Sequence, residues 1–276
     1  MSGQVRVPIA LTIAGSDSSG GAGIQADLKT FTALGVYGAS VLTALTAQNT
    51  RGVTGVHAVP AAFIVAQIDA VMGDLAVGAI KTGMLATRET VETVAAELRL
   101  HRHLPLVVDP VMVATSGDTL LAPDAIAAVR QSLLPLAEVI TPNLPEAARL
   151  LDTTPAGRES EMIEQGRALL AFGPRAVLIK GGHGEGADAV DLLIEASGTT
   201  RFARPRIATH NTHGTGCTLA AAITALRASG VPLVEAVGGA KAFVWEALSA
   251  GSNLAIGTGN GQVDHLYAIR LAGRPV

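Results

Sequence analysis

Short runs of apolar residues recur along the chain, and each run ends at a polar or glycine-containing segment. The first covers residues 7–14 and stops at the glycine-rich segment 15–23, after which residues 24–34 carry apolar side chains at helical spacing. A continuous apolar run is typical of a strand buried on both faces, and such strands belong to parallel sheets covered by helices. The pattern therefore predicts a strand, a glycine-rich turn and a helix.

The same order repeats along the chain, and near Gly186 the period changes to that of a hairpin followed by helices. The predicted strands are 7–14, 39–47, 77–80, 106–108, 137–140 and 176–179, and the hairpin pairs 189–195 with 200–203. The predicted helices are 24–34, 62–72, 88–100, 123–134, 219–229 and 233–249, with a loop over 251–261. Because no repeat or linker interrupts this order, we expect one α/β domain over residues 1–276.

Composition narrows the class of partner. Hydrophobic residues make up 49% of the 276 residues and charged residues 16%, with a net charge of −3 and no basic cluster. This balance offers no electrostatic footprint for nucleic acid or an anionic membrane, and no apolar run reaches the ~18 residues of a membrane span. The start of the chain does not resemble a signal peptide, and a single cysteine excludes an internal disulfide. We expect a cytoplasmic protein that binds a small molecule, and the Ala- and Gly-rich helices favour a homodimer.

Polar side chains gather where the predicted strands end. Ligands of open parallel sheets bind outside the carboxyl ends of the strands, so one crevice is expected to collect these residues. They are Asp17, Asp27, Gln48, Met84, Asp109, Asn143, Glu146, Lys180 and a later Gly-Thr-Gly turn.

That turn, Gly214-Thr215-Gly216, leads directly into a helix-forming run. Backbone N–H groups at a helix N-terminus point toward one place and favour an anion, such as a phosphoryl group in transfer. A tight turn before a buried helix is the alternative explanation of the two glycines, but a spacer loop does not need the Thr212, His213, Thr215 and Cys217 side chains that surround them. The next residue, Cys217, stands where the helix dipole is expected to lower the pKa of a thiol.

Several common site motifs are missing, while two carboxylates suit a magnesium ion. The chain has no dinucleotide-binding Gly-x-Gly-x-x-Gly, no P-loop and no nucleophile elbow. Asp109 and Glu146 follow successive predicted strands and suit Mg²⁺, which takes one or two carboxylates plus substrate phosphates. Lys241, in an apolar stretch, is either a phosphate-facing lysine or a surface lysine. The histidines are not spaced as zinc ligands.

Eight segments spread along the chain, taken together, resemble the bacterial hydroxymethylpyrimidine/phosphomethylpyrimidine kinases of thiamine biosynthesis. The resemblance runs in order from about residue 9 to residue 268 and is specific because the motifs keep their order and spacing. The segments that carry it are residues 14–31, 43–50, 81–84, 109–112, 116–118, 141–146, 180–183 and 211–217.

The resemblance implies a ribokinase-like fold, with a mostly parallel sheet between two helical layers and a small flap. It implies two ATP-dependent phosphorylations of 4-amino-5-hydroxymethyl-2-methylpyrimidine, with ATP and Mg²⁺ as cofactors. The pyrimidine contacts carry over onto Gly15, Asp27, Gln48, Met84, Val111 and Cys217. The Mg-ATP contacts carry over onto Asp109, Asn143, Glu146, Lys180, Gly182, Thr215 and Lys241.

Cys217 stands where most ribokinase-like sugar kinases have a general-base aspartate, and the pyrimidine kinases share this cysteine. Whether the thiol takes a proton or only orients the hydroxyl is left open, because a dissociative transition state needs little base catalysis. Two alternatives also remain, a vitamin B6 kinase acting on pyridoxal or pyridoxine, and a non-catalytic pyrimidine-binding sensor.

Overall fold

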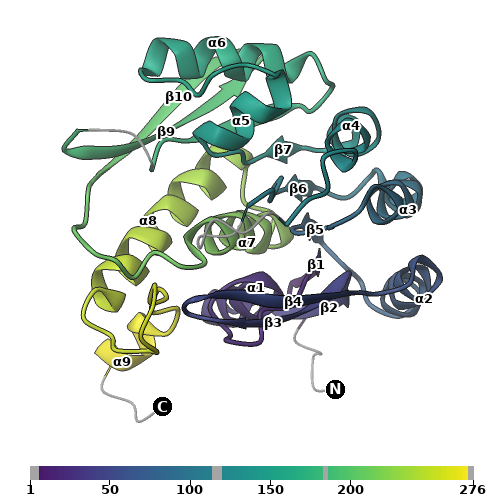
Figure 1. Ribbon diagram of the computed structural model, residues 1–276, viewed down its shortest axis with the longest axis horizontal. Helices are drawn as coiled ribbons and strands as arrows, with labels where there is room; N and C mark the ends of the chain where they lie inside the picture. Colours follow the sequence, from purple (N-terminus) through teal and green to yellow (C-terminus); the bar gives the residue numbers. More distant parts are fainter. Residues whose placement is uncertain (1–5, 114–119, 183–185, 273–276) are drawn as a thin grey trace.

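The computed structural model describes residues 6–113, 120–182 and 186–272. Residues 116–118 and His183, which belong to two of the motifs above, lie outside the described residues. The central feature is an eight-stranded sheet with helical layers on both faces (Figure 1).

The sheet is mostly parallel, in the order β10-β9-β8-β7-β6-β5-β1-β2. Strands β2, β1, β5, β6, β7 and β8 pair in parallel, while β9 is antiparallel to both of its neighbours. The strands are β1 Ile9–Ala14, β2 Tyr37–Leu42, β5 Ala79–Thr82, β6 Leu106–Val108, β7 Val139–Ile140, β8 Ala176–Lys180, β9 Asp188–Glu195 and β10 Gly198–Pro205. The predicted hairpin is confirmed as β9 and β10, and it extends the parallel sheet at one edge.

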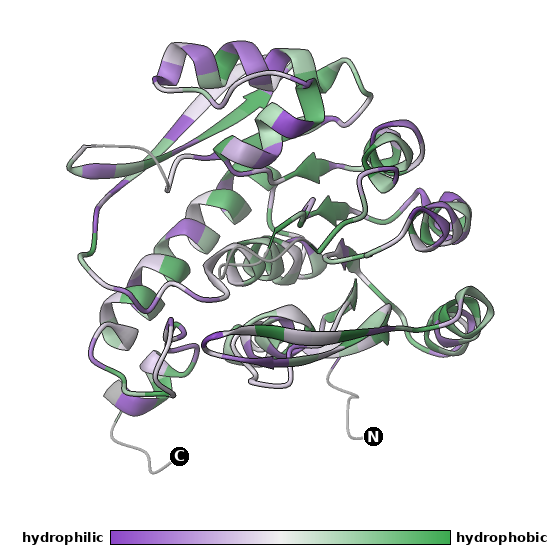
Figure 2. Ribbon diagram, viewed as in Figure 1, coloured by the Kyte–Doolittle hydropathy of each residue, from purple (hydrophilic) through white to green (hydrophobic). Residues whose placement is uncertain are grey.

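Alternate residues of the strands pack into different helical layers, which explains why the strands are apolar throughout. Leu106 and Val108 face one layer, whereas Val107 between them faces the other. The first layer contains α2 Ala61–Met72, α3 Arg88–Leu98, α4 Ala125–Ala128, α5 Leu144–Leu151 and α6 Glu159–Leu170, and the second contains α1 Gly23–Ala33, α7 Thr215–Ala228 and α8 Leu233–Gly251. Figure 2 shows hydrophobic strands between helices of mixed polarity.

The predicted strand over residues 39–47 is wrong, because the chain leaves the main sheet at Thr43. The Thr43 N–H donates to Ala14 and its hydroxyl donates to the Met84 carbonyl oxygen, and these bonds turn the chain. The following strand, β3 Ala44–Asn49, pairs only with β4 Gly52–Ala58. This two-stranded flap has alternating buried and exposed residues along β3, as expected of a hairpin with one covered face.

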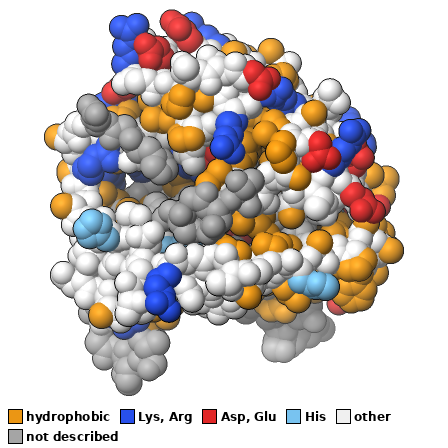
Figure 3. Space-filling view, viewed as in Figure 1, with side chains coloured by type: hydrophobic (Ala, Val, Ile, Leu, Met, Phe, Trp, Pro, Cys, Tyr) orange, Lys and Arg blue, Asp and Glu red, His pale blue; other side chains and the backbone are white. Residues whose placement is uncertain are grey.

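Two other differences concern helices. The predicted helix 123–134 is divided into α4, a π-helical turn Val129–Leu133 and a 3₁₀ turn Leu134–Leu136 that contains Pro135. The helices α6 and α9 Tyr267–Leu271 were not predicted. Across the described ranges, no helix combines the length and the hydropathy needed to cross a bilayer. Lys and Arg side chains are scattered over the face shown in Figure 3 and form no continuous patch there.

Candidate active site

A pocket of about 700 Å³ opens at the carboxyl ends of the parallel strands. Its position confirms the expectation that polar groups at these ends share one crevice. All but one of the site residues named from the sequence line it: Gly15, Gln48, Met84, Asp109, Val111, Asn143, Glu146, Lys180, Gly182, Gly214, Thr215, Gly216, Cys217 and Lys241. The exception is Asp27.

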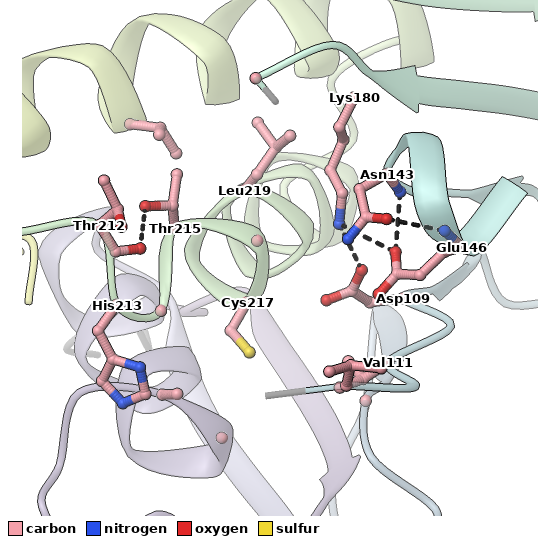
Figure 4. A pocket seen from close by; sticks show the side chains of 18 of the residues that line it. Asp109, Val111, Asn143, Glu146, Lys180, Thr212, His213, Thr215, Cys217 and Leu219 are labelled. Carbon is pink, nitrogen blue, oxygen red and sulfur yellow. Dashed lines mark hydrogen bonds and ion pairs between the residues drawn. The ribbon is translucent and has the colours of Figure 1, made fainter. Parts of the chain in front are cut away.

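The turn before α7 lines the pocket with its backbone. Gly214 caps α7 with a φ of +79°, and a side chain there would strike the carbonyl oxygen of Gly21. The glycine therefore lets the turn pack directly on the first glycine-rich segment. At Gly216 an added Cβ would lie 3.2 Å from the Lys180 ammonium. The first amides of α7 thus lie beside a cation, an arrangement suited to an anion (Figure 4).

Asp17 and His213 hold these two glycine-rich segments together. The His213 Nε2 lies 2.8 Å from an Asp17 carboxylate oxygen, and both side chains are buried. The same carboxylate accepts the backbone N–H groups of Ser19, Gly21 and Ala22. Although burial raises the pKa of Asp17, the hydrogen bonds from His213 and from Ser19 and Ala22 lower it to about 2. A stable carboxylate therefore shapes the first turn, and His213 connects it to α7.

Asp27 lies beneath the pocket floor rather than on its surface. Both of its oxygens lie 2.8 Å from the Lys81 ammonium, and one also accepts the Thr12 hydroxyl at 2.7 Å. The side chains of Asp27 and Lys81 are completely buried. Thr12 and Lys81 are paired residues of β1 and β5, so they face the same helical layer as α1, which carries Asp27. Direct contact between Asp27 and a substrate stays a prediction, and the structure assigns its carboxylate to Lys81.

The Cys217 thiol is held in its protonated form. Burial raises its pKa to about 11. The nearby charge of Lys81 opposes this effect, while the charges of Asp27 and Asp109 add to it. The expectation that the helix dipole lowers the thiol pKa is therefore wrong for this site. At neutral pH the group beside the α7 amides is an SH, which can orient a hydroxyl but is a poor base.

Lys180 joins the two carboxylates that suit a metal. Its ammonium lies 2.9 Å from Asp109 and 3.9 Å from Glu146. Burial raises the Asp109 pKa, but Lys180, Lys81 and the Thr141 hydroxyl bring it below its usual value. Burial and the Asp109 charge raise the Glu146 pKa to about 7 despite Lys180. One carboxylate is charged at neutral pH, and the other is half protonated.

Asn143 and Glu146 are fixed by the local chemistry of the α5 N-terminus. The Asn143 side chain accepts the Glu146 N–H, and the Glu146 carboxylate accepts the Asn143 N–H, both at 2.8 Å. This capping box satisfies two amides that the helix leaves unpaired. The motif predicted from Pro145 and Glu146 is therefore a helix start, and it aims both side chains at the pocket.

Gln48 and Met84 reach the pocket from different elements. The Gln48 backbone exchanges hydrogen bonds with the Ser18 hydroxyl, and its side-chain oxygen accepts the Thr46 hydroxyl at 3.1 Å. A side chain at Gly15 would collide with the Met84 methyl group, so the glycine makes room for it. Together with Val111, these residues line the pocket with an amide and apolar surface.

Lys241 lines the pocket from α8, where its ammonium lies 2.6 Å from Asp191. Asp191 also accepts the Gly181 N–H at 3.0 Å. Sequence reasoning missed Asp191, although an acidic residue inside the otherwise apolar run 189–194 was a usable signal. It also missed Lys81, which stands inside the quoted 81–84 motif, and Arg206, whose guanidinium donates to the Gly182 carbonyl oxygen at 2.6 Å. No local pattern distinguishes Arg206.

Comparisons with known proteins agree on one family. The model of the family described as phosphomethylpyrimidine kinase matches residues 17–264. A hydroxymethylpyrimidine/phosphomethylpyrimidine kinase of Rhizobium meliloti is 58% identical over 259 residues, which cover 94% of this chain and 97% of that protein. The ADP complex of Bacillus subtilis pyridoxal kinase has a TM-score of 0.88 and 38% identity, covering 96% of this chain and 100% of that one. A phosphomethylpyrimidine kinase from Clostridium difficile has a TM-score of 0.78 and 43% identity, with coverages of 88% and 100%.

Proposed function

Because the chain belongs to the phosphomethylpyrimidine kinase family, we propose that it phosphorylates 4-amino-5-hydroxymethyl-2-methylpyrimidine with ATP. The first transfer produces the monophosphate and the second the diphosphate, as a step of thiamine biosynthesis. The observation that carries the proposal is the meeting of Gln48, Met84 and Val111 with the α7 amides and the Asp109, Asn143, Glu146 and Lys180 group in one pocket.

The pyrimidine side of the pocket matches a flat heterocycle. Gln48 offers a donor and an acceptor to ring nitrogens and the exocyclic amine, while Met84 and Val111 supply apolar contact. In this orientation the hydroxymethyl group faces Cys217 and the turn at Gly214. The protonated Cys217 orients the hydroxyl in our proposal, because a dissociative phosphoryl transfer needs little help from a base.

The opposite side of the pocket is suited to Mg-ATP. Asn143, Lys180, Gly182 and Thr215 are proposed to contact the nucleotide, and Lys241 and the α7 amides the transferring phosphoryl group. Such preorganised donors are typically worth ~3 kcal/mol each in the transition state. Among the described residues, no atom lies within 4 Å of the place where a Gly182 side chain would begin, which suits a ligand against the backbone.

Asp109 and Glu146 are the proposed magnesium ligands. The described residues contain no group of three or more His, Cys, Asp or Glu side chains that would form a complete metal site. Two carboxylates facing a phosphate pocket nevertheless fit an ion that completes its shell with water and phosphate oxygens. When bound, Mg²⁺ would neutralise phosphate charge.

The decisive assay supplies ATP, Mg²⁺ and the pyrimidine alcohol, and resolves monophosphate from diphosphate over time. We expect both products in sequence, and strong loss of turnover in Lys241→Ala. Pyridoxal and pyridoxine are assayed in parallel, because a higher kcat/KM on either would favour the vitamin B6 alternative. Tight pyrimidine binding without any turnover would instead indicate a sensor.

A homodimer is also proposed, supported by exposed apolar side chains on neighbouring elements. Tyr37, Leu45 and Phe63 are between 44% and 62% exposed and belong to β2, β3 and α2. Exposed apolar side chains that gather in this way are typical of an interaction surface. The cytoplasmic location and the lack of a nucleic-acid partner stay predictions from the sequence.

A further inference from the structure

The flap that carries Gln48 depends on packing for its order. It contains only β3 and β4, and a two-stranded hairpin is marginally stable in water. Close to its tip, the Ser18 hydroxyl holds the Gln48 backbone. Its tip, at Thr50, lies two residues beyond Gln48, so contacts of the tip influence the position of the Gln48 amide.

The tip of the flap is bound by a glycine-rich segment near the end of the chain, residues 255–262, which we call the strap. The Gly259 N–H donates to the Thr50 hydroxyl at 3.1 Å, and the Asn260 N–H donates to the Thr50 carbonyl oxygen at 2.9 Å. In Figure 1 the tip of the β3–β4 ribbon lies beside the loops that follow α8. Residues about 200 positions apart in the sequence are thus joined by backbone hydrogen bonds.

The other end of the strap is bound to the turn before α7, which lines the pocket. The Gly261 carbonyl oxygen accepts the His213 N–H at 3.0 Å, and Gln262 forms a parallel bridge with His213. Nearby, the Asn211 side chain donates to the carbonyl oxygens of Gly251, Ser252 and Leu254. The strap therefore spans from the flap tip to the turn that contains Gly214.

The alternate glycines of the strap are required by close approach. An added side-chain carbon at Gly257 or at Gly259 would strike Thr50, and one at Gly261 would strike Asn211. Gly257 also has a φ of +72°, which disfavours other residues. None of the strap residues lines the pocket, so the segment contacts both walls without contacting the ligand.

We propose that the strap is a positioning element that fixes the flap, and with it Gln48, relative to the α7 turn. This inference deepens the proposed function, on which it rests, by assigning substrate specificity to residues outside the pocket. It follows that disturbing the strap weakens recognition of the pyrimidine more than recognition of ATP, whose proposed contacts lie at the start of α5, at the end of β8 and just after it, and at the start of α7.

Gly259→Ala is the principal test, because its methyl group collides with the Thr50 backbone and cannot be accommodated by a rotamer change. We expect KM for the pyrimidine alcohol to rise about tenfold, equivalent to about 1.4 kcal/mol, with KM for ATP within about twofold of wild type. Thr258→Ala is the matched control, since it changes an exposed neighbour in the same segment. Equal increases in both KM values, or an unchanged pyrimidine KM, would overturn the proposal.

A double-mutant cycle identifies the contact itself. Gly257→Ala collides mainly with the Thr50 side chain, where the added carbon would lie 2.7 Å from Cγ2. Thr50→Ala removes the obstructing atoms, and it also removes the hydroxyl that accepts the Gly259 N–H. The rise in pyrimidine KM of the double variant should therefore be smaller than the product of the rises in the two single variants, although the positive φ at position 257 keeps part of the effect. Additive losses would contradict the assigned contact.

Hydrogen exchange separates this proposal from the proposed function. Amides of β3 and β4 should exchange faster in Gly259→Ala than in wild type, with no ligand present, while the central strands keep their protection. This result is expected even if the wild-type protein fails to phosphorylate the pyrimidine. Unchanged exchange in the flap would exclude the strap as its anchor.

Discussion

Glu146 combines a structural role with a proposed role in metal binding, and its pKa makes the second role depend on pH. The folded-state pKa of about 7 is above the ordinary 4.5, so the carboxyl group gains its proton as pH falls through 7. The protonated Glu146 contributes fully to folding stability at pH values below its unfolded-state pKa of 4.5, and this contribution is lost as pH rises through 7. Loss of the proton, in turn, prepares the carboxylate for Mg²⁺.

We therefore expect Mg-ADP to bind about tenfold more weakly at pH 6 than at pH 8, since each pKa unit corresponds to about 1.4 kcal/mol. Calorimetric titration at several pH values measures this dependence. Glu146→Gln is the control, because glutamine keeps the shape of the side chain but has no carboxyl group to titrate. The same slope in both proteins would assign the effect to the nucleotide phosphates.

Cys217 offers a direct test of its protonation state, because it is the only cysteine in the chain. With a pKa of about 11, the alkylation rate of the nucleotide-free protein should keep rising between pH 8 and pH 10. The measurement is iodoacetamide labelling followed by mass spectrometry. A plateau near pH 7 would mean that the thiolate is present and available as a base.

Lys81 and Asp27 stabilise the protein only as a pair. Lys81→Met leaves a buried carboxylate without its cation, which costs about 3–5 kcal/mol of unfolding free energy. The double variant Lys81→Met/Asp27→Leu should lie closer to wild type, because no charge is left buried. Urea unfolding measures both. A small loss in Lys81→Met would show that Asp27 takes up a proton or finds another partner, since burial already raises its pKa.

At the scale of elements, helix starts show how the same local chemistry serves stability or function. Thr87 caps α3 by accepting the Thr90 N–H at 3.2 Å, and Asn143 caps α5 in the same way at 2.8 Å. Of these two caps, Asn143 lines the pocket and Thr87 does not. The helix start is thus determined locally, while its use depends on where the strand before it ends.

Replacing either cap with alanine should lower the unfolding free energy by about 1 kcal/mol. Asn143→Ala should in addition reduce kcat/KM for ATP, whereas Thr87→Ala should leave it unchanged. Thermal unfolding and steady-state kinetics on both variants provide the comparison. Equal kinetic effects would mean that the loss in Asn143→Ala is only a loss of stability.

At the scale of the whole molecule, the proposed dimer is tested by mass in solution. We expect twice the chain mass of 28.0 kDa, and dissociation in Phe63→Glu because a charge would be buried at the interface. Leu100→Glu is the control, since this leucine is 72% exposed but lies after α3, away from the proposed surface. Light scattering coupled to size exclusion reports the mass. A wild-type monomer would contradict the proposal.

The sequence by itself determined the layered α/β architecture and most of the pocket wall. Buried parallel strands must be apolar along their length, and their polar ends must meet at one edge, so patterns such as 106–108 followed by Asp109 are readable without coordinates. The family resemblance added the roles of individual residues.

Tertiary structure alone decided three features, and each depends on contacts between distant segments. The strand beginning at residue 39 divides at Thr43 because Ala14 and Met84 bind it there. Asp27, on α1, lies below the pocket surface because it pairs with Lys81 of β5. The Cys217 pKa rises because burial disfavours the thiolate, with the charges of Asp27 and Asp109 adding to the effect. Local patterns carry propensity and periodicity, whereas desolvation and pairing depend on the segments that the fold brings together.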